Sequence, residues 1–578
     1  MLFPKTNTYR QYIDLSGYWD FRVDPKATGV DSGWGEGLEN TRPIAVPASW
    51  NDQFEDYRDY LGDGWYQTRF DLPWGWEQQR VFVRFGSVNY IAEVWVNGHL
   101  LGEHEGGHLP FEFDITSHMQ REGNRLVVRV NGELDERRVP PGNVPEHPDD
   151  VYPFLSYPNV NFVFFPYCGI QQPVLLYTRP NGAISDVQVT TDIREGNGMV
   201  RVKVTRSSTD AVTVRLKIRG LGAEVDRDLE TSSESVEVTL MVPHAALWSP
   251  QNPNLYDLTV ELATSLGTFD RYTLPVGIRT IKAEADGLLL NGEKIAIKGF
   301  GLHNDMPMVG RGNARADVIK DLSLMRWMGA NCLRAKGYPP SEEVLDICDR
   351  LGMLVIDETP AAGLVFAGTG LEKRYHMSRQ VSRELVARDK NHPSVIMWSL
   401  SGEPHSRRGA SQLFLDRMRK DMQETDKSRP FTVASMVGID ENAFKVLDVV
   451  CLDLYPAWES SPGQIKEAMA ELATALDNIH EKFPKPVIMT EFAPDAIPGH
   501  HALPSEMWSE EYQAEVVANV IQVLRSKPYV IGHMPGTLAD YRVAQSTAAP
   551  MGMAYRGMFT RERRPKLAAH SLRTLWRR

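Results

Sequence analysis

The first part of the chain alternates hydrophobic and polar positions over short segments, which is the pattern of β-strands that bury one face. Residues 65–72, 80–85 and 92–96 show this alternation, and Asn97-Gly98 supplies a tight hairpin turn after the third segment. Turn-forming residues recur between the segments at a spacing typical of antiparallel sandwiches. We therefore predict a jelly-roll β-sandwich over residues 1–180.

A second set of alternating segments follows, including 199–204, 212–218 and 256–262. The segments are short and closely spaced, as in sandwiches that fit seven strands into roughly 100 residues. The pattern predicts an immunoglobulin-like β-sandwich over residues 181–279.

After residue 280 the pattern changes to a buried apolar strand followed by an amphipathic helix, repeated along the chain. The first unit pairs 295–301 with a helix at 316–329, and the third pairs 354–357 with a helix at 374–389. A succession of eight such strands fits a (β/α)8 TIM barrel over residues 280–578. The chain is thus predicted to be a multidomain protein that combines α/β and all-β domains.

Charge and motif content exclude several classes of protein. The net charge is −12, and no basic run or basic helix is present, which argues against nucleic acid or a membrane as partner. The four cysteines lack metal-ligand spacing, and no phosphate-binding loop or nucleotide fingerprint occurs, so we expect no cofactor and no metal. Without a visible signal peptide or membrane-spanning run, the expected location is cytoplasmic.

Two glutamates end buried apolar runs in matching contexts. Glu403 follows the fourth predicted barrel strand, and Glu491 follows the seventh. Side chains at the carboxyl ends of barrel strands meet at the rim where such barrels carry out their chemistry. Two carboxyl groups that face each other across a sugar are what cleavage of a glycosidic bond requires. A lone glutamate in such a position is better explained as a strand cap or the partner of an arginine, but two glutamates in matching contexts favour catalysis.

The domain order together with these two glutamates resembles glycoside hydrolase family 2 over essentially the whole chain. Several segments are closest in motif to the β-glucuronidase branch of that family. They are Ile297-Lys-Gly-Phe-Gly-Leu-His303, Val355-Ile-Asp-Glu-Thr359, Asn391-His-Pro-Ser394, Met507-Trp-Ser-Glu-Glu-Tyr512 and Gly557-Met-Phe-Thr-Arg-Glu-Arg-Arg-Pro-Lys566.

The resemblance implies a retaining double displacement on a carbohydrate or glycoconjugate. Glu491 would be the nucleophile, and Glu403 would be the acid/base that holds its proton near neutral pH because an ionised carboxylate lies close by. Tyr455 matches the family tyrosine that orients the nucleophile. By the same analogy the protein is expected to be a homo-oligomer.

Seven further residues are predicted to bind the sugar. His303, Asp305 and Arg334 follow or end barrel strands at the same rim, and the family resemblance places Gly402 and Arg556 at the sugar. Arg334 among them would either restrain Glu491 or pair with a structural acid. The predicted loop at 139–150 is long enough to cover such a site. The seven residues are His303, Asp305, Arg334, Lys336, Gly402, Asp453 and Arg556.

The sequence departs from the family pattern around this pocket. Gly402 stands where the family has the asparagine that binds the sugar 2-hydroxyl, Arg556 ends Ala-Tyr-Arg in place of Asn-x-Lys, and Gly536 replaces a tryptophan. We expect the two glycines to leave room for a substituent on the sugar. We expect Lys336 and Arg556 to favour an acidic sugar such as a uronic acid.

The combined features predict an exo-β-glycosidase that removes a terminal β-linked uronic acid or another decorated sugar. Within the enzyme class, the alternative is a hydrolase of neutral sugars similar to a β-galactosidase. Outside it, the alternatives are a non-catalytic carbohydrate-binding relative and a structural or partner-binding β-sandwich protein. The presence of both glutamates argues against a non-catalytic relative. The barrel argues against a structural or partner-binding β-sandwich protein, because such a protein would have no use for it.

Overall fold

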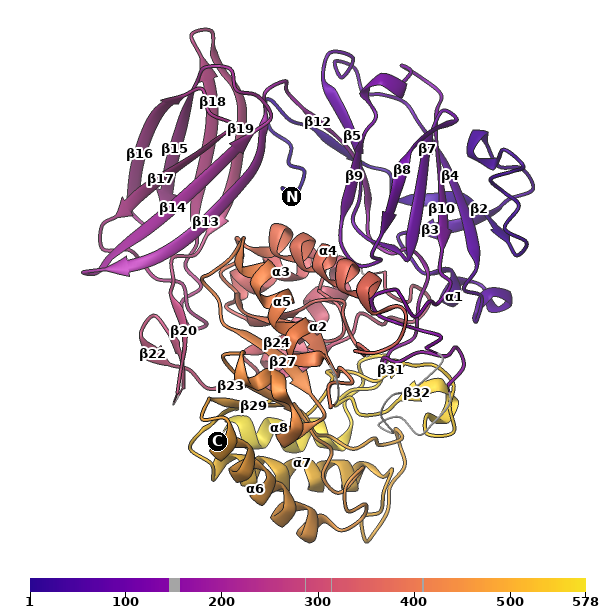
Figure 1. Cartoon of the computed structure of the whole chain (residues 1–578), viewed down its shortest axis with the longest axis vertical. Helices are drawn as coiled ribbons and strands as arrows, with labels where there is room; N and C mark the ends of the chain where they lie inside the picture. Colours follow the sequence, from indigo (N-terminus) through magenta and orange to yellow (C-terminus); the bar gives the residue numbers. More distant parts are fainter. Residues whose placement is uncertain (145–155, 286, 313, 408–409, 578) are drawn as a thin grey trace.

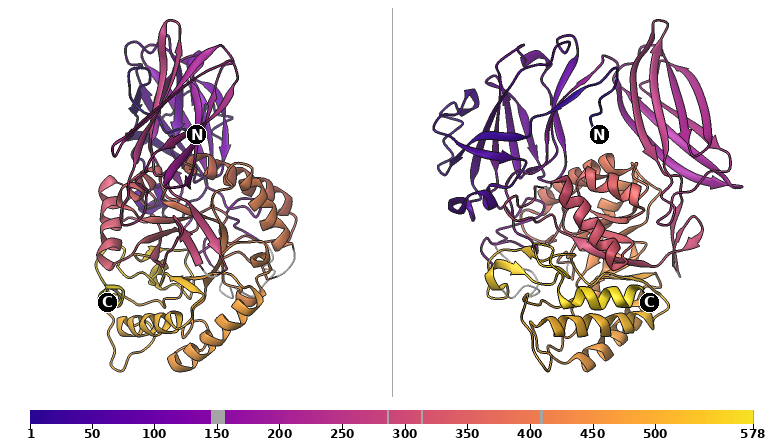
Figure 2. Two further views of the ribbon diagram at one scale, coloured as in Figure 1. Left: turned by 90° about the vertical axis from the view of Figure 1, so that its left-hand side faces the viewer. Right: turned by 180° about the vertical axis from the view of Figure 1, so that it is seen from behind.

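The computed structural model describes residues 1–144, 156–285, 287–312, 314–407 and 410–577. Two β-domains stand side by side above a helix-covered barrel, and the N-terminus lies between them (Figure 1). The view from behind shows the same arrangement, with the late segment around β32 beneath the first β-domain (Figure 2). The predicted loop at 139–150 lies outside the described residues from residue 145 onward.

The first domain packs a four-stranded antiparallel sheet against a six-stranded one, which confirms the predicted β-sandwich. Alternate side chains, among them Trp19, Phe21 and Val128, fill the space between the sheets. The four strands are, in spatial order, β1 (Tyr12–Asp14), β12 (Val174–Arg179), β5 (Arg80–Phe85) and β9 (Phe111–Asp114); the six are β3 (Arg42–Val46), β2 (Gly17–Asp24), β4 (Asp63–Phe70), β10 (Asn124–Asn131), β7 (Ile91–Val96) and β8 (His99–Glu105).

The second domain is a seven-stranded antiparallel sandwich, as the immunoglobulin-like pattern predicts. Every second side chain of β15 is buried, namely Val212, Val214, Leu216 and Ile218, so one face of the strand forms the core. One sheet contains β13 (Ile184–Arg194), β14 (Asn197–Arg206) and β17 (Ser235–Val242); the other contains β16 (Ala223–Thr231), β15 (Val212–Gly220), β18 (Tyr256–Thr264) and β19 (Gly267–Val276).

The third domain is a closed barrel of eight parallel strands, which confirms the predicted (β/α)8 fold. Pairing of the first strand with the eighth closes the barrel. All residues of the fourth strand are buried, which explains its continuous apolar run. The strands are β23 (Ile297–Leu302), β24 (Cys332–Ala335), β25 (Leu354–Glu358), β26 (Val395–Gly402), β27 (Phe431–Ser435), β28 (Val450–Asp453), β29 (Val487–Glu491) and β30 (Val530–His533).

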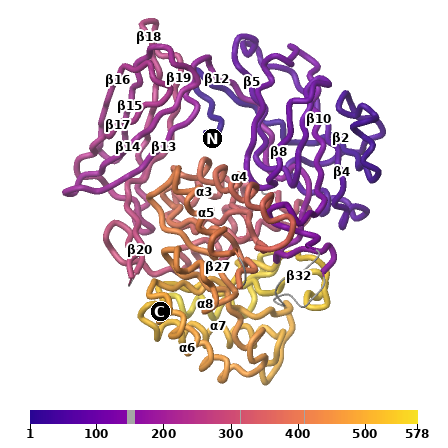
Figure 3. The backbone as a smooth tube through the Cα atoms, viewed as in Figure 1, coloured from indigo at the N-terminus to yellow at the C-terminus, as the bar shows by residue number. Residues whose placement is uncertain are grey.

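Helices cover the outside of the barrel, and the tube in Figure 3 shows α6, α7 and α8 grouped at the end away from the β-domains. Two short 3-10 turns, Gly438–Asp440 and Asn442–Lys445, follow β27 in place of an α-helix. No helix in the described ranges combines the length and the apolar character that a bilayer crossing requires. The barrel helices are α2 (Arg315–Met328), α3 (Glu342–Leu351), α4 (Leu371–Asp389), α5 (Ser411–Gln423), α6 (Ile465–Lys482), α7 (Glu510–Arg525) and α8 (Leu567–Arg577).

A buried ion pair joins three parts of the fold near the second domain. His392 Nδ1 lies 2.6 Å from Asp349 Oδ2, and Asp349 Oδ1 accepts a hydrogen bond from the Ser394 N–H at 3.0 Å. Trp248 donates its indole N–H to the Asp349 carbonyl at 2.9 Å. The pair therefore links α3, the segment before β26 and the connection between β17 and β18 in the second sandwich.

We expect the substitution His392→Asn to lower the free energy of unfolding by about 2 kcal/mol at acidic pH and by less at alkaline pH. Burial alone would lower the pKa of His392, but Asp349 outweighs it and raises the pKa from 6.5 to about 9. The stabilisation is therefore complete below pH 6.5 and is lost as the pH rises through about 9. Urea unfolding of both proteins at several pH values measures the difference, and a difference that grows with pH contradicts the prediction.

Candidate active site

Three carboxylates meet at the carboxyl ends of three barrel strands. Glu403 directly follows β26, while Asp453 and Glu491 are the last residues of β28 and β29. One oxygen from each lies within 4.8 Å of the other two, and all three side chains are buried. Glu403 has a φ of +48°, a left-handed conformation that is unfavourable for a residue with a side chain and is often found at functional sites. The structure thus brings both predicted catalytic glutamates together.

Lys336 places an ammonium group between these glutamates. Its side chain extends from the residue after β24, contacts Glu491 Oε2, and lies 3.6 Å from Glu403 Oε1. Only 2% of the side chain is exposed. Both close partners of Lys336 in this structure are carboxylates of the protein, and its contact with an acidic sugar stays a prediction.

The electrostatic environment of Glu403 differs from the one predicted. Burial acts to raise its pKa, but Lys336, Arg556 and Arg334 outweigh this effect, and the pKa falls below its usual value. The expectation that Glu403 holds its proton near neutral pH is therefore wrong for this arrangement. Tyr455 donates its hydroxyl to Glu403 Oε1 at 3.1 Å, so its hydrogen bond is to the predicted acid/base instead of the predicted nucleophile.

Arg334 lies beneath the carboxylates and pairs with structural acids. Its Nη1 lies 3.1 Å from Asp453 Oδ2, and its Nη2 lies 3.1 Å from Glu358 Oε2. Of the two roles considered for Arg334, the structure supports pairing with a structural acid. Burial raises the pKa of Asp453 to about 7 against the opposing effect of Arg334, with Glu403 and Glu491 adding to the rise. The predicted sugar ligands Arg334 and Asp453 therefore form the floor under the two glutamates.

Glu358 also fills the space expected beside Gly402. A Cβ added to Gly402 would lie 2.4 Å from Glu358 Oε1, too close for any side chain. The Gly337 N–H donates to the same oxygen at 2.7 Å. The expected enlargement at Gly402 is therefore wrong. At Gly536 a Cβ would lie 3.4 Å from the Arg556 carbonyl oxygen and 3.8 Å from Glu491 Cγ, so a methyl group would fit there in ordinary contact. Room for a sugar substituent at Gly536 stays a prediction.

Arg556 is the more accessible cation of the site. Its Nη1 lies 3.5 Å from Glu491 Oε1 and its Nη2 lies 3.3 Å from Asp495 Oδ2, while the guanidinium stands 4.9 Å from the Tyr455 ring centre. The side chain is 16% exposed, against 2% for Lys336. A ligand that enters the site therefore meets Arg556 before Lys336.

Two predicted sugar ligands that follow β23 have different surroundings. His303 packs at 4.0 Å against the ring of Tyr541, and burial together with the nearby Lys336 keeps its pKa well below 6.5 and the ring neutral. Asp305 lies away from the carboxylates and accepts hydrogen bonds from Arg561 and from Tyr167 of the first domain. These bonds join the first domain to the barrel, and the predicted sugar contact of Asp305 stays a prediction.

Sequence reasoning missed two members of the site. Asp495, which pairs with Arg556, stands four residues after Glu491, and this short spacing was a usable signal. Tyr541 belongs to β31 (Tyr541–Arg542), a short strand that pairs outside the barrel with β32 (Met553–Ala554). No sequence pattern indicates this two-stranded sheet outside the barrel, so the position of Tyr541 beside His303 could not be predicted.

Comparison with known proteins agrees with this architecture domain by domain. The sugar binding domain model of glycosyl hydrolases family 2 matches residues 12–180, a second model of the family matches 182–279, and its TIM barrel model matches 281–578. A β-glucuronidase of Paenibacillus borealis is 36% identical, with 100% of this chain and 98% of the relative covered. The human β-glucuronidase is also 36% identical, over 99% of this chain and 92% of the human protein.

Solved structures show the same similarity. The β-glucuronidase of Ruminococcus gnavus in complex with uronic isofagomine superposes with a TM-score of 0.93 at 32% identity, covering 100% of this chain and 99% of that one. The complex of the same enzyme with D-glucuronic acid gives a TM-score of 0.92. Family models that together span nearly the whole chain, and full-length relatives at this identity, establish that the chain belongs to glycosyl hydrolases family 2 and is a glycoside hydrolase.

Proposed function

We propose that this enzyme is a retaining exo-β-glycosidase that releases a terminal β-linked uronic acid. The observation that carries the proposal is the spacing of the carboxylates, since oxygens of Glu403 and Glu491 lie within 4.8 Å of each other. Retaining glycosidases hold their two carboxyl groups about 5–5.5 Å apart, whereas inverting enzymes need about 6.5–9.5 Å to admit a water.

The chemistry follows in two balanced steps. Glu491 attacks the anomeric carbon while the bond to the leaving oxygen breaks, and the protonated fraction of Glu403 gives its proton to that oxygen. Because the lowered pKa keeps this fraction small at neutral pH, the step is favoured at acidic pH. Water then attacks the anomeric carbon of the glycosyl ester, Glu403 takes a proton from the water, and the Glu491 carboxylate is released. Arg556 can bind the sugar carboxylate with two hydrogen bonds, because its guanidinium is the more exposed cation near the reacting carbon.

The similarity to β-glucuronidases supports a uronic acid as the sugar. The full-length relatives from Paenibacillus borealis and human carry that name, and the solved Ruminococcus gnavus enzyme is described with D-glucuronic acid bound. We also propose a cytoplasmic location, which the four free, buried cysteines support.

We expect hydrolysis of an aryl β-glucuronide to exceed that of the matching β-galactoside and β-glucoside. An aryl β-galacturonide separates a general preference for acidic sugars from recognition of the glucuronide itself. Proton NMR of the first product formed tests retention, and an initial α-anomer contradicts it. Turnover confined to neutral sugars would replace the acidic-sugar proposal with the β-galactosidase-like alternative.

A further inference from the structure

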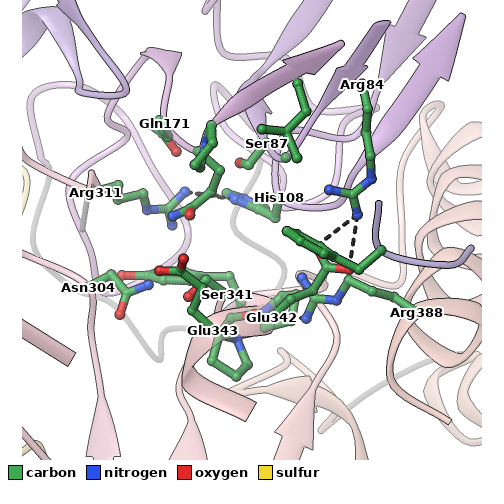
Figure 4. A pocket seen from close by; sticks show the side chains of 18 residues that line it. Arg84, Ser87, His108, Gln171, Asn304, Arg311, Ser341, Glu342, Glu343 and Arg388 are labelled. Atoms are coloured by element: carbon green, nitrogen blue, oxygen red, sulfur yellow. Dashed lines mark hydrogen bonds and ion pairs between the residues drawn. The ribbon is translucent and has the colours of Figure 1, made fainter. Parts of the chain in front are cut away.

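A small cavity lies between the first β-domain and the barrel, away from the three carboxylates. Its volume is about 60 Å³, enough for roughly five water molecules if each needs about 10–15 Å³. Arg84 and His108 line it from the first domain, and Asn304, Arg311 and Ser341 line it from the barrel. Figure 4 shows Arg84 and Arg311 extending into the pocket from different sides, with a dashed line joining Arg311 to His108.

Arg311 contributes a buried charge to this cavity without a carboxylate partner in the described part of the chain. It is 3% exposed, and its Nη1 donates to His108 Nδ1 at 2.7 Å. Its Nη2 is buried and has no hydrogen-bond partner among the described residues. The guanidinium stands 3.6 Å from the ring centre of Tyr338. Burial and Arg311 together lower the pKa of His108 well below 6.5, so that ring is neutral.

The other charged groups that line the cavity are compensated. Each arginine or glutamate other than Arg311 has an oppositely charged partner within 3.0 Å, so the cavity keeps one excess positive charge. The Nε of Arg84 is nevertheless buried without a hydrogen-bond partner in the described residues, which provides a second donor. The ion pairs are Arg84 with Glu342, Arg315 with Glu343, and Arg388 with Asp389.

The N-terminus of α3 also borders the cavity. Ser341 is its N-cap residue, and the serine side chain makes no capping hydrogen bond. The backbone at a helix N-terminus carries partial positive charge and unsatisfied N–H groups, which attract anions. This feature adds to the uncompensated charge of Arg311, because both face the same space.

We propose that this cavity binds a compact oxyanion, such as inorganic phosphate, sulfate or a small carboxylate. A buried, unpaired guanidinium is costly, and an oxyanion that accepts from Arg311 Nη2 would remove that cost. Since residues of both domains line the cavity, the bound anion would hold the first β-domain against the barrel. The inference concerns a site outside the carboxylate cluster and does not depend on the proposed function.

Calorimetric titration of the whole protein with phosphate, sulfate and acetate, each at matched ionic strength in a sodium chloride background, tests the proposal. We expect saturable 1:1 binding of at least one of the three, and the comparison identifies which anion the cavity prefers. We also expect that anion to raise the Tm by a few degrees at millimolar concentration, where general salting effects are small.

Three variants locate the binding. Arg311→Gln should weaken it at least tenfold, whereas Glu343→Gln should strengthen it, because one carboxylate beside the cavity is removed. Lys336→Met should leave it unchanged, because Lys336 belongs to the carboxylate cluster. If Arg311→Gln does not fold, the different responses expected of Glu343→Gln (stronger binding) and Lys336→Met (unchanged binding) still decide the question.

Two results would overturn the proposal. One is the absence of saturable binding of all three anions to the wild-type protein. The other is binding that Lys336→Met abolishes and Glu343→Gln leaves unchanged, which would assign the anion to the active site.

Discussion

Replacing Glu491 by glutamine is expected to lower kcat on the preferred aryl glycoside by at least about 10³-fold. An amide cannot form the glycosyl ester on which the double displacement depends, although it has nearly the same shape. Glu491 is fully buried and contacts Lys336, so the glutamine can keep a hydrogen bond there. Initial rates of the two proteins, with circular dichroism to confirm folding, measure the effect. A loss smaller than tenfold would remove Glu491 from the nucleophile position.

The two glutamates can be told apart by adding azide to truncated variants. In Glu491→Ala the small anion fills the space of the missing nucleophile and attacks directly, so an α-glycosyl azide is expected. In Glu403→Ala the enzyme ester still forms from an activated aryl substrate, and azide then attacks it to give a β-glycosyl azide. The reverse assignment of products would exchange the roles of Glu403 and Glu491.

The architecture could be predicted because it depends on local periodicity. The apolar runs that end at Glu403 and Glu491 are short and continuous, as required of barrel strands buried on both faces. Parallel neighbours must then present their carboxyl ends at one rim, so the meeting of the two glutamates follows from strand order alone. Helix limits were predictable for the same reason, since caps and amphipathic periodicity are encoded locally.

The partners of the charged side chains could not be predicted in this way. Arg561, which donates a hydrogen bond to Asp305, lies 256 residues further along the chain, and nothing in the sequence near either residue indicates the pairing. Glu358 occupies the space beside Gly402, so the loss of a side chain there does not enlarge the pocket. Lys336 has a flexible stem and reaches two carboxylates on different strands. Such pairings depend on tertiary packing, which sequence periodicity does not contain.

Replacing Lys336 by methionine is expected to shift the alkaline limb of the pH–rate profile upward and to raise kcat/KM there by roughly tenfold or more. Glu403 is faced by Lys336, Arg556, Arg334 and Tyr455, and by the carboxylates of Asp453 and Glu491. The cations outweigh burial and lower its pKa. A general acid works in its protonated form, so activity is lost as the pH rises through this pKa.

Removal of the Lys336 ammonium leaves the negative charges of Glu403 and Glu491 facing each other with less positive charge nearby. Burial and the charge of Glu491 then favour the protonated form of Glu403, which is the form that the first chemical step consumes. The variant should also be less stable at neutral pH than the wild type, because carboxylates that had a buried partner have lost it. The gain in rate and the loss of stability therefore have one electrostatic origin and should appear in the same protein.

Lys336→Arg is the matched control, because it keeps the positive charge and should leave the alkaline limb near its wild-type position. The pH dependence of kcat/KM reports the pKa values of groups in the free enzyme, in which Lys336 contacts the two glutamates. Because carboxylate oxygens of Asp453 and Glu491 lie within 4.8 Å of Glu403, the measured limb reports the cluster and not one residue. A limb that stays fixed in Lys336→Met, or moves equally in Lys336→Arg, would show that Lys336 does not set the protonation of the acid/base. In that case its contact with Glu491 would act by blocking the anomeric carbon, and Lys336→Met would then raise kcat/KM equally at every pH.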